Sequence, residues 1–233
     1  GQFIDSYRKM YLPNYGVFDE DRYFRRGEVC PVYTIGGAGV GVNICEDIWY
    51  SLGSIAVQRE AGAELIVNIN ASPFHAGKRV HRERMISTRA ADNGVYVAYL
   101  NMVGGQDELV FDGASLVCDM AGEVTARGAA FAEDLVIADL NVDAVFRSRL
   151  RDPRPRKENS TILQEIGIPK LLHVSDAPLF KSPNSQMAPV AKCMDVVEEV
   201  YHALVLGTRD YMHRVRLVFP PSSEPVARAD TFF

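Results

Sequence analysis

Two apolar runs separated by a glycine pair constrain the fold of this 233-residue chain more than any other feature. The runs cover residues 32–35 and 40–44, and Gly36 and Gly37 lie between them. Because consecutive glycines readily adopt the positive φ angles of a tight turn, the pattern predicts a β-hairpin. The glycines do not form a dinucleotide-binding fingerprint, because the G-x-G-x-x-G spacing is not met and a strand follows them instead of a helix.

Helix-like and strand-like segments alternate after this hairpin. Helices are predicted over residues 54–63 and 78–93, and Gly94 closes the second. The predicted strands cover residues 64–69, 95–101, 113–118 and 135–140. This mixture of hairpins and strand-helix units predicts an α/β protein whose sheets are buried under helices.

The sequence changes character after about residue 151. Repeated prolines interrupt any long element over residues 151–188, which predicts a linker or an extended arm. Apolar residues then recur at helical spacing from Val190 to Val205, so a helix is predicted over residues 189–214. The tail over residues 215–233 has no clear period and is left unassigned.

Composition and charge exclude several classes of protein. With 47% hydrophobic and 24% charged residues, the chain is globular rather than disordered. Its net charge of −5 lacks the basic excess of a nucleic-acid binder, so we expect small-molecule or protein partners. No apolar run approaches the roughly 20 residues of a membrane span, and the start does not resemble a signal peptide. We therefore expect a soluble cytoplasmic protein.

The four cysteines are widely spaced and predict no metal site. We expect Cys30, Cys118 and Cys193 to be buried apolar side chains. Cys45 differs because it ends the apolar strand at residues 40–44 and precedes a turn into a helix, where an elbow can expose a nucleophile. Spacing alone leaves two interpretations of Cys45 open, a catalytic thiol and a core thiol.

Four sequence blocks lie in order within the first 150 residues. They are RKMYLPNYGVFDE at 8–20, CEDIW at 45–49, NASPF at 70–74 and GGQDELVFDG at 104–113. Together they resemble the glutaminase domain of glutamine-dependent NAD synthetases, a nitrilase-like carbon-nitrogen hydrolase domain. A fifth block, EVYHALVLGTRDY at 199–211, resembles the helix that opens the synthetase domain of that family. The resemblance implies an α-β-β-α four-layer sandwich over residues 1–150, incomplete at its N-terminus.

The resemblance also implies site residues. Cys45 matches the nucleophile of the family and Lys9 its catalytic lysine. The thiolate would attack the side-chain amide of glutamine, ammonia would leave, and water would release glutamate from the thioester. The Lys9 cation would favour the thiolate and stabilise the oxyanion that forms. Tyr15 and Ser72 match positions that line the glutamine pocket, and Glu108 matches a loop carboxylate near the site.

Other expectations concern helix capping, cofactors and partners. Glu46 and Asp47 are expected to cap the helix that follows Cys45. No cofactor is expected in this chain, because ATP and magnesium would belong to the synthetase part. That part, as a domain or subunit, would accept the ammonia and convert deamido-NAD to NAD. The resemblance further implies a homo-oligomer in the complete enzyme.

The sequence departs from the family at both ends. The general-base glutamate, which precedes the lysine in a Phe-Pro-Glu sequence, has no counterpart ahead of Lys9. Because base catalysis contributes about 10²–10⁴-fold, we expect slow turnover by this chain in isolation. The Ser-Gly-Gly-x-Asp-Ser phosphate loop of the synthetase domain is also not found. Two alternatives stay open: a hydrolase acting on another amide or a carbamoyl group, and a non-catalytic fragment.

Overall fold

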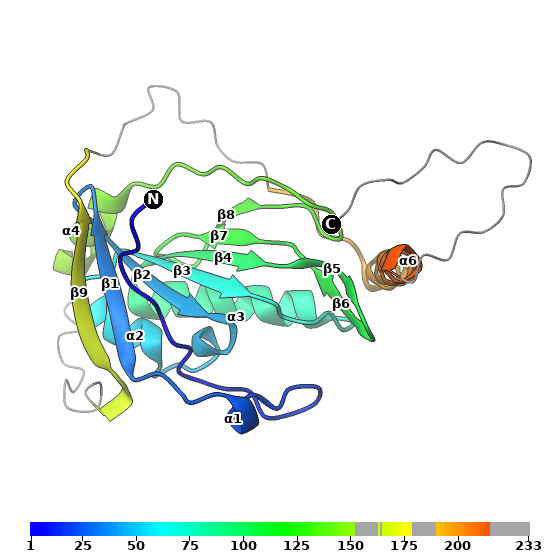
Figure 1. Ribbon diagram of the computed structural model, residues 1–233. Helices are drawn as coiled ribbons and strands as arrows, with labels where there is room; N and C mark the ends of the chain where they lie inside the picture. The colour runs from blue at the N-terminus through cyan, green and yellow to red at the C-terminus, as the bar shows by residue number, and fades with distance from the viewer. Residues whose placement is uncertain (152–162, 164, 179–189, 215–233) are drawn as a thin grey trace, which may run out of the picture.

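The computed structural model describes residues 1–151, 163, 165–178 and 190–214, which are built around one large mixed sheet (Figure 1). Its seven strands run in the order β8-β7-β4-β3-β2-β1-β9. They are β1 (Val29–Ile35), β2 (Ala38–Ile44), β3 (Leu65–Asn70), β4 (Tyr96–Asn101), β7 (Leu116–Cys118), β8 (Val124–Arg127) and β9 (Ile168–Ser175). Strands β5 (Val103–Gln106) and β6 (Leu109–Asp112) form a separate two-stranded hairpin.

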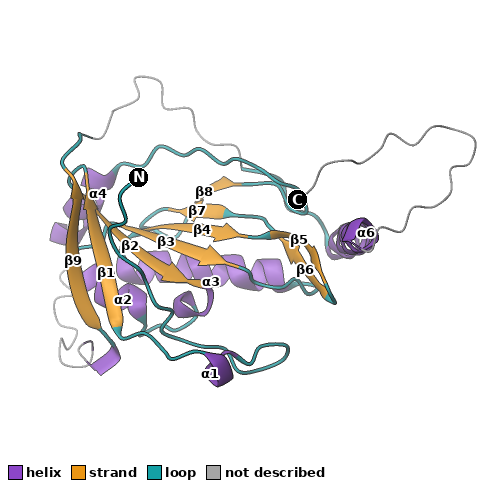
Figure 2. Ribbon diagram, viewed as in Figure 1, coloured by secondary structure: helices purple, strands orange, loops and turns teal. Residues whose placement is uncertain are grey.

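In the described part of the chain, helical segments accompany these strands, and most of them lie on one side of the large sheet or at its ends (Figure 2). They are α1 (Glu20–Tyr23), the 3-10 helix η1 (Cys45–Ile48), α2 (Ser54–Glu60), α3 (Lys78–Asn93), α4 (Val142–Arg151) and α6 (Val196–Arg214). The helix predicted over residues 78–93 is confirmed. Gly94 ends it in the left-handed conformation, with φ at 55°, as glycine commonly does after a helix.

The predicted glycine hairpin is confirmed by the pairing of β1 with β2. The two strands are antiparallel, and Val32 lies opposite Gly41. Gly36 and Gly37 have φ angles of 57° and 88°, which suits the tight turns that match the twist of hairpin strands. The hairpin therefore delivers β2 to the centre of the sheet, with Cys45 following its last residue.

The central strands β2, β3 and β4 are parallel, and α2 and α3 connect them. Both helices lie on the same side of the sheet (Figure 1). Ile66 of β3 and Val97 of β4 point to that side and pack with Ile55 of α2 and Ile86 of α3. This apolar layer is the principal core, and its burial stabilises the arrangement because removing apolar surface from water is favourable.

The opposite face of the sheet is less covered. Along β3, Ile66 is fully buried while Ile69, which points to the other face, is 46% exposed. Leu100 of β4 is 54% exposed in the same way. The α/β class predicted from the sequence is confirmed, and the described residues supply an adjacent helix layer and sheet layer of the expected α-β-β-α order.

One predicted strand is wrong, and four strands were not predicted. Residues 135–140 form no strand, because no strand of the described residues pairs with them, and Leu135 and Ile137 are 82% and 70% exposed. The strands that were missed are β5, β6, β8 and, in the region expected to be a linker, β9. Strands β5, β6 and β8 are each four residues long, too short for a pattern of apolar residues to identify them, and each pairs with a neighbouring strand.

The region expected to be a linker contributes a strand. Strand β9 pairs in parallel with β1 at the edge of the large sheet. The helix expected over residues 189–214 begins later, at Val196, where the Asp195 carboxylate accepts a hydrogen bond from the Glu198 N–H at 2.8 Å. The tail over residues 215–233 lies outside the described residues. The domain boundaries proposed from the sequence stay a prediction.

Helix α6 packs against the β5–β6 hairpin (Figure 2). The Gly105 N–H donates a hydrogen bond to Oδ2 of Asp210 at 2.7 Å. Ala203 and Leu206 face inward and are buried beside Phe131. No helix within the described residues combines the length and apolar character that a membrane crossing requires.

Truncating the buried Ile86 tests the packing of α3 on the sheet. Ile86→Ala removes a side chain that is 0% exposed, so we expect a loss of about 2–5 kcal/mol of unfolding free energy, measured by urea denaturation. Val80→Ala on the same helix is the matched control, because Val80 is 51% exposed and should change stability by less than about 0.5 kcal/mol. Equal losses for the two variants would contradict the observed packing.

Candidate active site around Cys45

Cys45 occupies a strained backbone position at the end of β2. It opens the short helix η1 with a φ of 45°, in the left-handed region that residues with a Cβ rarely adopt. Such strain costs about 1–3 kcal/mol and persists only where the surrounding structure enforces it. A strand end that turns sharply into a helix presents its side chain beyond the edge of the sheet, which is the geometry expected for a nucleophile.

Neighbouring groups shift the pKa of the Cys45 thiol in opposite directions. Burial raises the pKa of Cys45, and the Lys9 ammonium acts against this shift by favouring the thiolate. The negative charge of Glu46 raises the pKa further, whereas a hydrogen bond from the Ala71 backbone N–H lowers it. The thiol is therefore mostly protonated near neutral pH, and its thiolate depends on the cation and the N–H donor beside it.

Lys9 lies in the segment of residues 1–28 that precedes β1, here called the arm, and a carboxylate holds its side chain in place. Its ammonium contacts both carboxylate oxygens of Glu20 at 2.8 Å, and both side chains are mostly buried. Glu20 opens the one-turn helix α1. The sequence predicted both Lys9 and Cys45 as site residues, and the structure places the Lys9 charge close enough to act on the thiol. Glu20 was not predicted, because no local sequence pattern indicates that it pairs with Lys9.

Tyr15 reaches the site through Glu46. The Tyr15 hydroxyl donates a hydrogen bond to Oε2 of Glu46 at 2.8 Å. Burial and this hydrogen bond raise the pKa of Tyr15, so it stays a neutral phenol. The expectation that Glu46 caps a helix is wrong, since its described hydrogen bond goes to the arm. For Asp47 the expectation is confirmed in part, because Oδ2 accepts from the Ile44 N–H at the start of η1.

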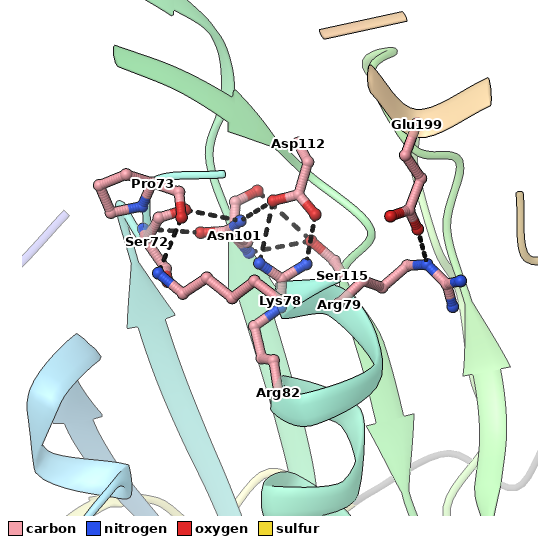
Figure 3. A network of polar contacts seen from close by, with 9 residues as sticks. All are labelled: Ser72, Pro73, Lys78, Arg79, Arg82, Asn101, Asp112, Ser115 and Glu199. Carbon is pink, nitrogen blue, oxygen red and sulfur yellow. Dashed lines mark hydrogen bonds and ion pairs between the residues drawn. The ribbon is translucent and has the colours of Figure 1, made fainter. Parts of the chain in front are cut away.

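Ser72 lies in a loop held by a buried polar network (Figure 3). The Ser72 N–H donates to Oδ1 of Asn101 at 2.9 Å, and the Asn101 amide donates to Asp112 at 3.1 Å. Asp112 also accepts two hydrogen bonds from Arg82 of α3, at 2.9 and 2.6 Å. Because charge-assisted bidentate pairs have fixed geometry, this network positions the loop that carries Ser72 and the adjacent Ala71 N–H.

Lys78 is a second cation at the site, and the sequence analysis did not predict it as a site residue. It opens α3, and its ammonium donates to the Pro73 carbonyl at 2.7 Å (Figure 3). Burial lowers the pKa of Lys78, with a further contribution from Arg82, while the negative charges of Cys45 and Glu46 oppose the shift. The sequence predicted a helix that begins at Lys78. The proximity of Lys78 to Cys45, however, depends on how α3 packs against the sheet.

Glu108 is not brought to the other predicted residues. It lies in the turn of the β5–β6 hairpin and is exposed. Within the described residues, no hydrogen bond or ion pair joins it to Cys45, Lys9, Tyr15 or Ser72. Its role near the site stays a prediction.

The remaining cysteines separate into two groups. Cys30 and Cys118 are buried as predicted, and burial raises the pKa of Cys30 to about 12 and that of Cys118 to about 11. For Cys193 the prediction is wrong, because this cysteine is exposed in the segment ahead of α6. Among the described residues, no cluster of three or more His, Cys, Asp or Glu side chains is arranged to hold a metal ion.

Comparison with known proteins assigns the family. Residues 1–149 match the model of the carbon-nitrogen hydrolase family. Two curated relatives, both glutamine-dependent NAD(+) synthetases, come from Aquifex aeolicus, with 42% identity over 214 residues, and from Thermotoga maritima, with 43% over 216. Each alignment covers 92% of this chain and 36% of the relative, so the chain spans about a third of the length of these relatives.

Solved structures share the fold. The glutamine-dependent NAD+ synthetase from Acinetobacter baumannii, solved with ADP, has 31% identity and a TM-score of 0.66 over 89% of this chain and 32% of that one. A mutant amidase from Nesterenkonia sp. AN1, carrying acrylamide on its active-site cysteine, has 29% identity and a TM-score of 0.53, covering 63% of this chain and 56% of that one. These likenesses confirm the nitrilase-like fold class predicted from the sequence.

Replacing Lys9 tests whether its charge acts on the thiol. Lys9→Met removes the cation that favours the Cys45 thiolate, so we expect the midpoint of the pH dependence of Cys45 alkylation by iodoacetamide to rise by about one unit. Below the midpoint, this corresponds to about tenfold slower alkylation. The exposed Lys192→Met is the matched control. An unchanged profile in Lys9→Met would contradict the described electrostatics.

Proposed function

The chain belongs to the carbon-nitrogen hydrolase family, and on that premise we propose that it hydrolyses the side-chain amide of glutamine with Cys45 as the nucleophile. The observation that carries this proposal is the position of the Cys45 thiol, on a strained backbone and within reach of the Lys9 charge and the Ala71 N–H. The covalent adduct on the active-site cysteine of the Nesterenkonia amidase supports the same role for the thiol in a related fold.

The reaction follows from the groups around the thiol. The Cys45 thiolate attacks the amide carbon, and negative charge develops on the amide oxygen. The Lys9 cation and a backbone N–H stabilise this oxyanion. The proton lost by the thiol goes to the amide nitrogen, so that ammonia leaves and a thioester remains. Water then attacks the thioester, glutamate leaves, and the sulfur regains a proton.

The charges near Cys45 favour an amino-acid substrate. The charges of Glu46, which accepts a hydrogen bond from the Tyr15 hydroxyl, and of Lys78 both interact with the Cys45 thiol. A free amino acid such as glutamine carries one positive and one negative group next to its α-carbon. The carboxylate and the ammonium of the site can each pair with one of them. A simple amide lacks both charges, so this arrangement favours glutamine over the alternative substrates.

The ammonia would serve a synthetase. The relatives that align over most of this chain are named glutamine-dependent NAD(+) synthetases, and the chain matches a third of their length. We therefore propose that the released ammonia is used by a synthetase domain or subunit for ATP-dependent conversion of deamido-NAD to NAD. ATP and magnesium would bind to that part, and a homo-oligomer is expected for the complete enzyme.

Ammonia release from L-glutamine tests the proposed reaction. We expect slow release by the purified protein and none by Cys45→Ala, measured with a coupled ammonia assay. Cys193→Ala is the matched control, because it removes an exposed thiol outside the site. Equal release from the unsubstituted protein and Cys45→Ala would contradict the role of Cys45.

An affinity label tests the same site without turnover. A chloromethyl ketone analogue of glutamine loses chloride when a thiolate attacks it, so we expect one adduct per chain, located on Cys45 by peptide mass. L-glutamine should protect against labelling, and acetamide at the same concentration should not. Equal protection by the two amides would favour a general amidase over a glutaminase.

A further inference from the structure

We propose that Asp47 is a positioning residue. It holds the arm that carries Lys9 at a fixed position relative to Cys45. This inference rests on the proposed function, because it concerns how the lysine and the nucleophile are brought together. Asp47 lies two residues after Cys45 and is fully buried. It touches neither thiol nor substrate in the scheme above, so any effect on catalysis acts through the groups that it holds.

The Asp47 carboxylate accepts hydrogen bonds from both sides of the site. On the arm, Oδ1 accepts from the backbone N–H groups of Met10 and Tyr11, at 3.0 and 2.9 Å. On the strand, Oδ2 accepts from the Ile44 N–H at 3.0 Å. Oδ2 also accepts from the Tyr7 hydroxyl at 2.6 Å. Four donors therefore converge on one ionised side chain.

The positions of these donors in the chain link them to the catalytic groups. Met10 and Tyr11 directly follow Lys9, and Ile44 directly precedes Cys45. The carboxylate thus fixes the backbone after the lysine and the backbone before the nucleophile at the same time. A helix cap would need only the bond from Ile44, so the three bonds to the arm point to a second role for Asp47.

The neighbouring Glu46 supports this interpretation. It accepts a hydrogen bond from Tyr15, which follows Lys9 along the arm, as Met10 and Tyr11 do. The consecutive carboxylates of η1 therefore hold the arm at Tyr7, ahead of the lysine, and at Met10, Tyr11 and Tyr15, after it. Packing adds to this hold, since Met10 is buried against Cys30 and α2. The arm belongs to no strand of the large sheet, so side-chain contacts of this kind determine where Lys9 lies.

An ionised carboxylate is required at this position. Its two oxygens offer about four acceptor sites, which match the four donors. Burial raises the pKa of Asp47, and the hydrogen bonds from Tyr7 and the backbone oppose that shift. An asparagine would keep one acceptor oxygen and turn an NH₂ group towards two of the donors. Asp47→Asn should therefore release one side of the contact, and the Lys9 cation should no longer be held near the thiol.

The pH dependence of Cys45 alkylation by iodoacetamide separates positioning from a direct charge effect. Removing the negative charge of Asp47 would by itself favour the thiolate and move the midpoint down. If the Lys9 ammonium is no longer held near the thiol, the midpoint of the pH dependence of alkylation rises. The other groups whose charges interact with the thiol are unchanged by the substitution: Glu20, Glu46, Tyr15, Lys78 and Tyr99.

We expect the midpoint of Asp47→Asn to rise to that of Lys9→Met, a shift of about one unit, as read from the mass of the Cys45 peptide. Asp119→Asn is the matched control, because this carboxylate accepts two backbone N–H bonds in an exposed turn remote from the site. It should leave the midpoint unchanged. A folded Asp47→Asn with an unchanged or lowered midpoint would overturn the inference.

A milder variant covers the case in which Asp47→Asn does not fold. Tyr7→Phe removes only the hydroxyl bond at 2.6 Å and keeps both backbone bonds of the arm. We expect it to raise the midpoint by part of the shift seen in Lys9→Met, and no shift would overturn the inference. Alkylation needs no glutamine, so absent ammonia release with these shifts intact would contradict the proposed function alone.

Discussion

The half-buried Cys45 thiol depends on charge supplied by residues far from it in the sequence. Burial disfavours its thiolate, and the structure counters this with the Lys9 ammonium from the arm and the Ala71 N–H from the end of β3. Lys9 is in turn held by both oxygens of Glu20. Because these contributions come from separate segments, a reactive thiol exists only once the arm, β2 and β3 have assembled.

The scaffold provides rigidity where these segments meet. The parallel strands β2 and β3 end side by side, which brings Cys45 next to the loop of Ser72. The buried pair Arg82–Asp112 ties that loop to α3 through Asn101 (Figure 3). Buried charges are costly unless they are paired, so such a network favours one arrangement over alternatives and keeps the loop in place.

Local sequence patterns correctly predicted those helices and turns whose formation depends mainly on the backbone preferences of their own residues. The Gly36–Gly37 turn and the helix closed by Gly94 follow from backbone preferences, and the family blocks brought Cys45 and Lys9 forward. The strand predicted at residues 135–140 failed because an apolar run needs a partner strand as well as a pattern. Glu20, Lys78 and the arm contacts of Asp47 were missed for a related reason: each acts through a partner brought near by tertiary packing.

The central claim is that Cys45 forms a thioester with the glutamyl group of glutamine. The most direct measurement is the mass of the Cys45 peptide after the purified protein is mixed with L-glutamine and quenched in acid, which preserves a thioester. The account predicts a glutamyl adduct on Cys45 that disappears after treatment with hydroxylamine. Ammonia release without any adduct on Cys45, or an adduct on Cys193 instead, would contradict it.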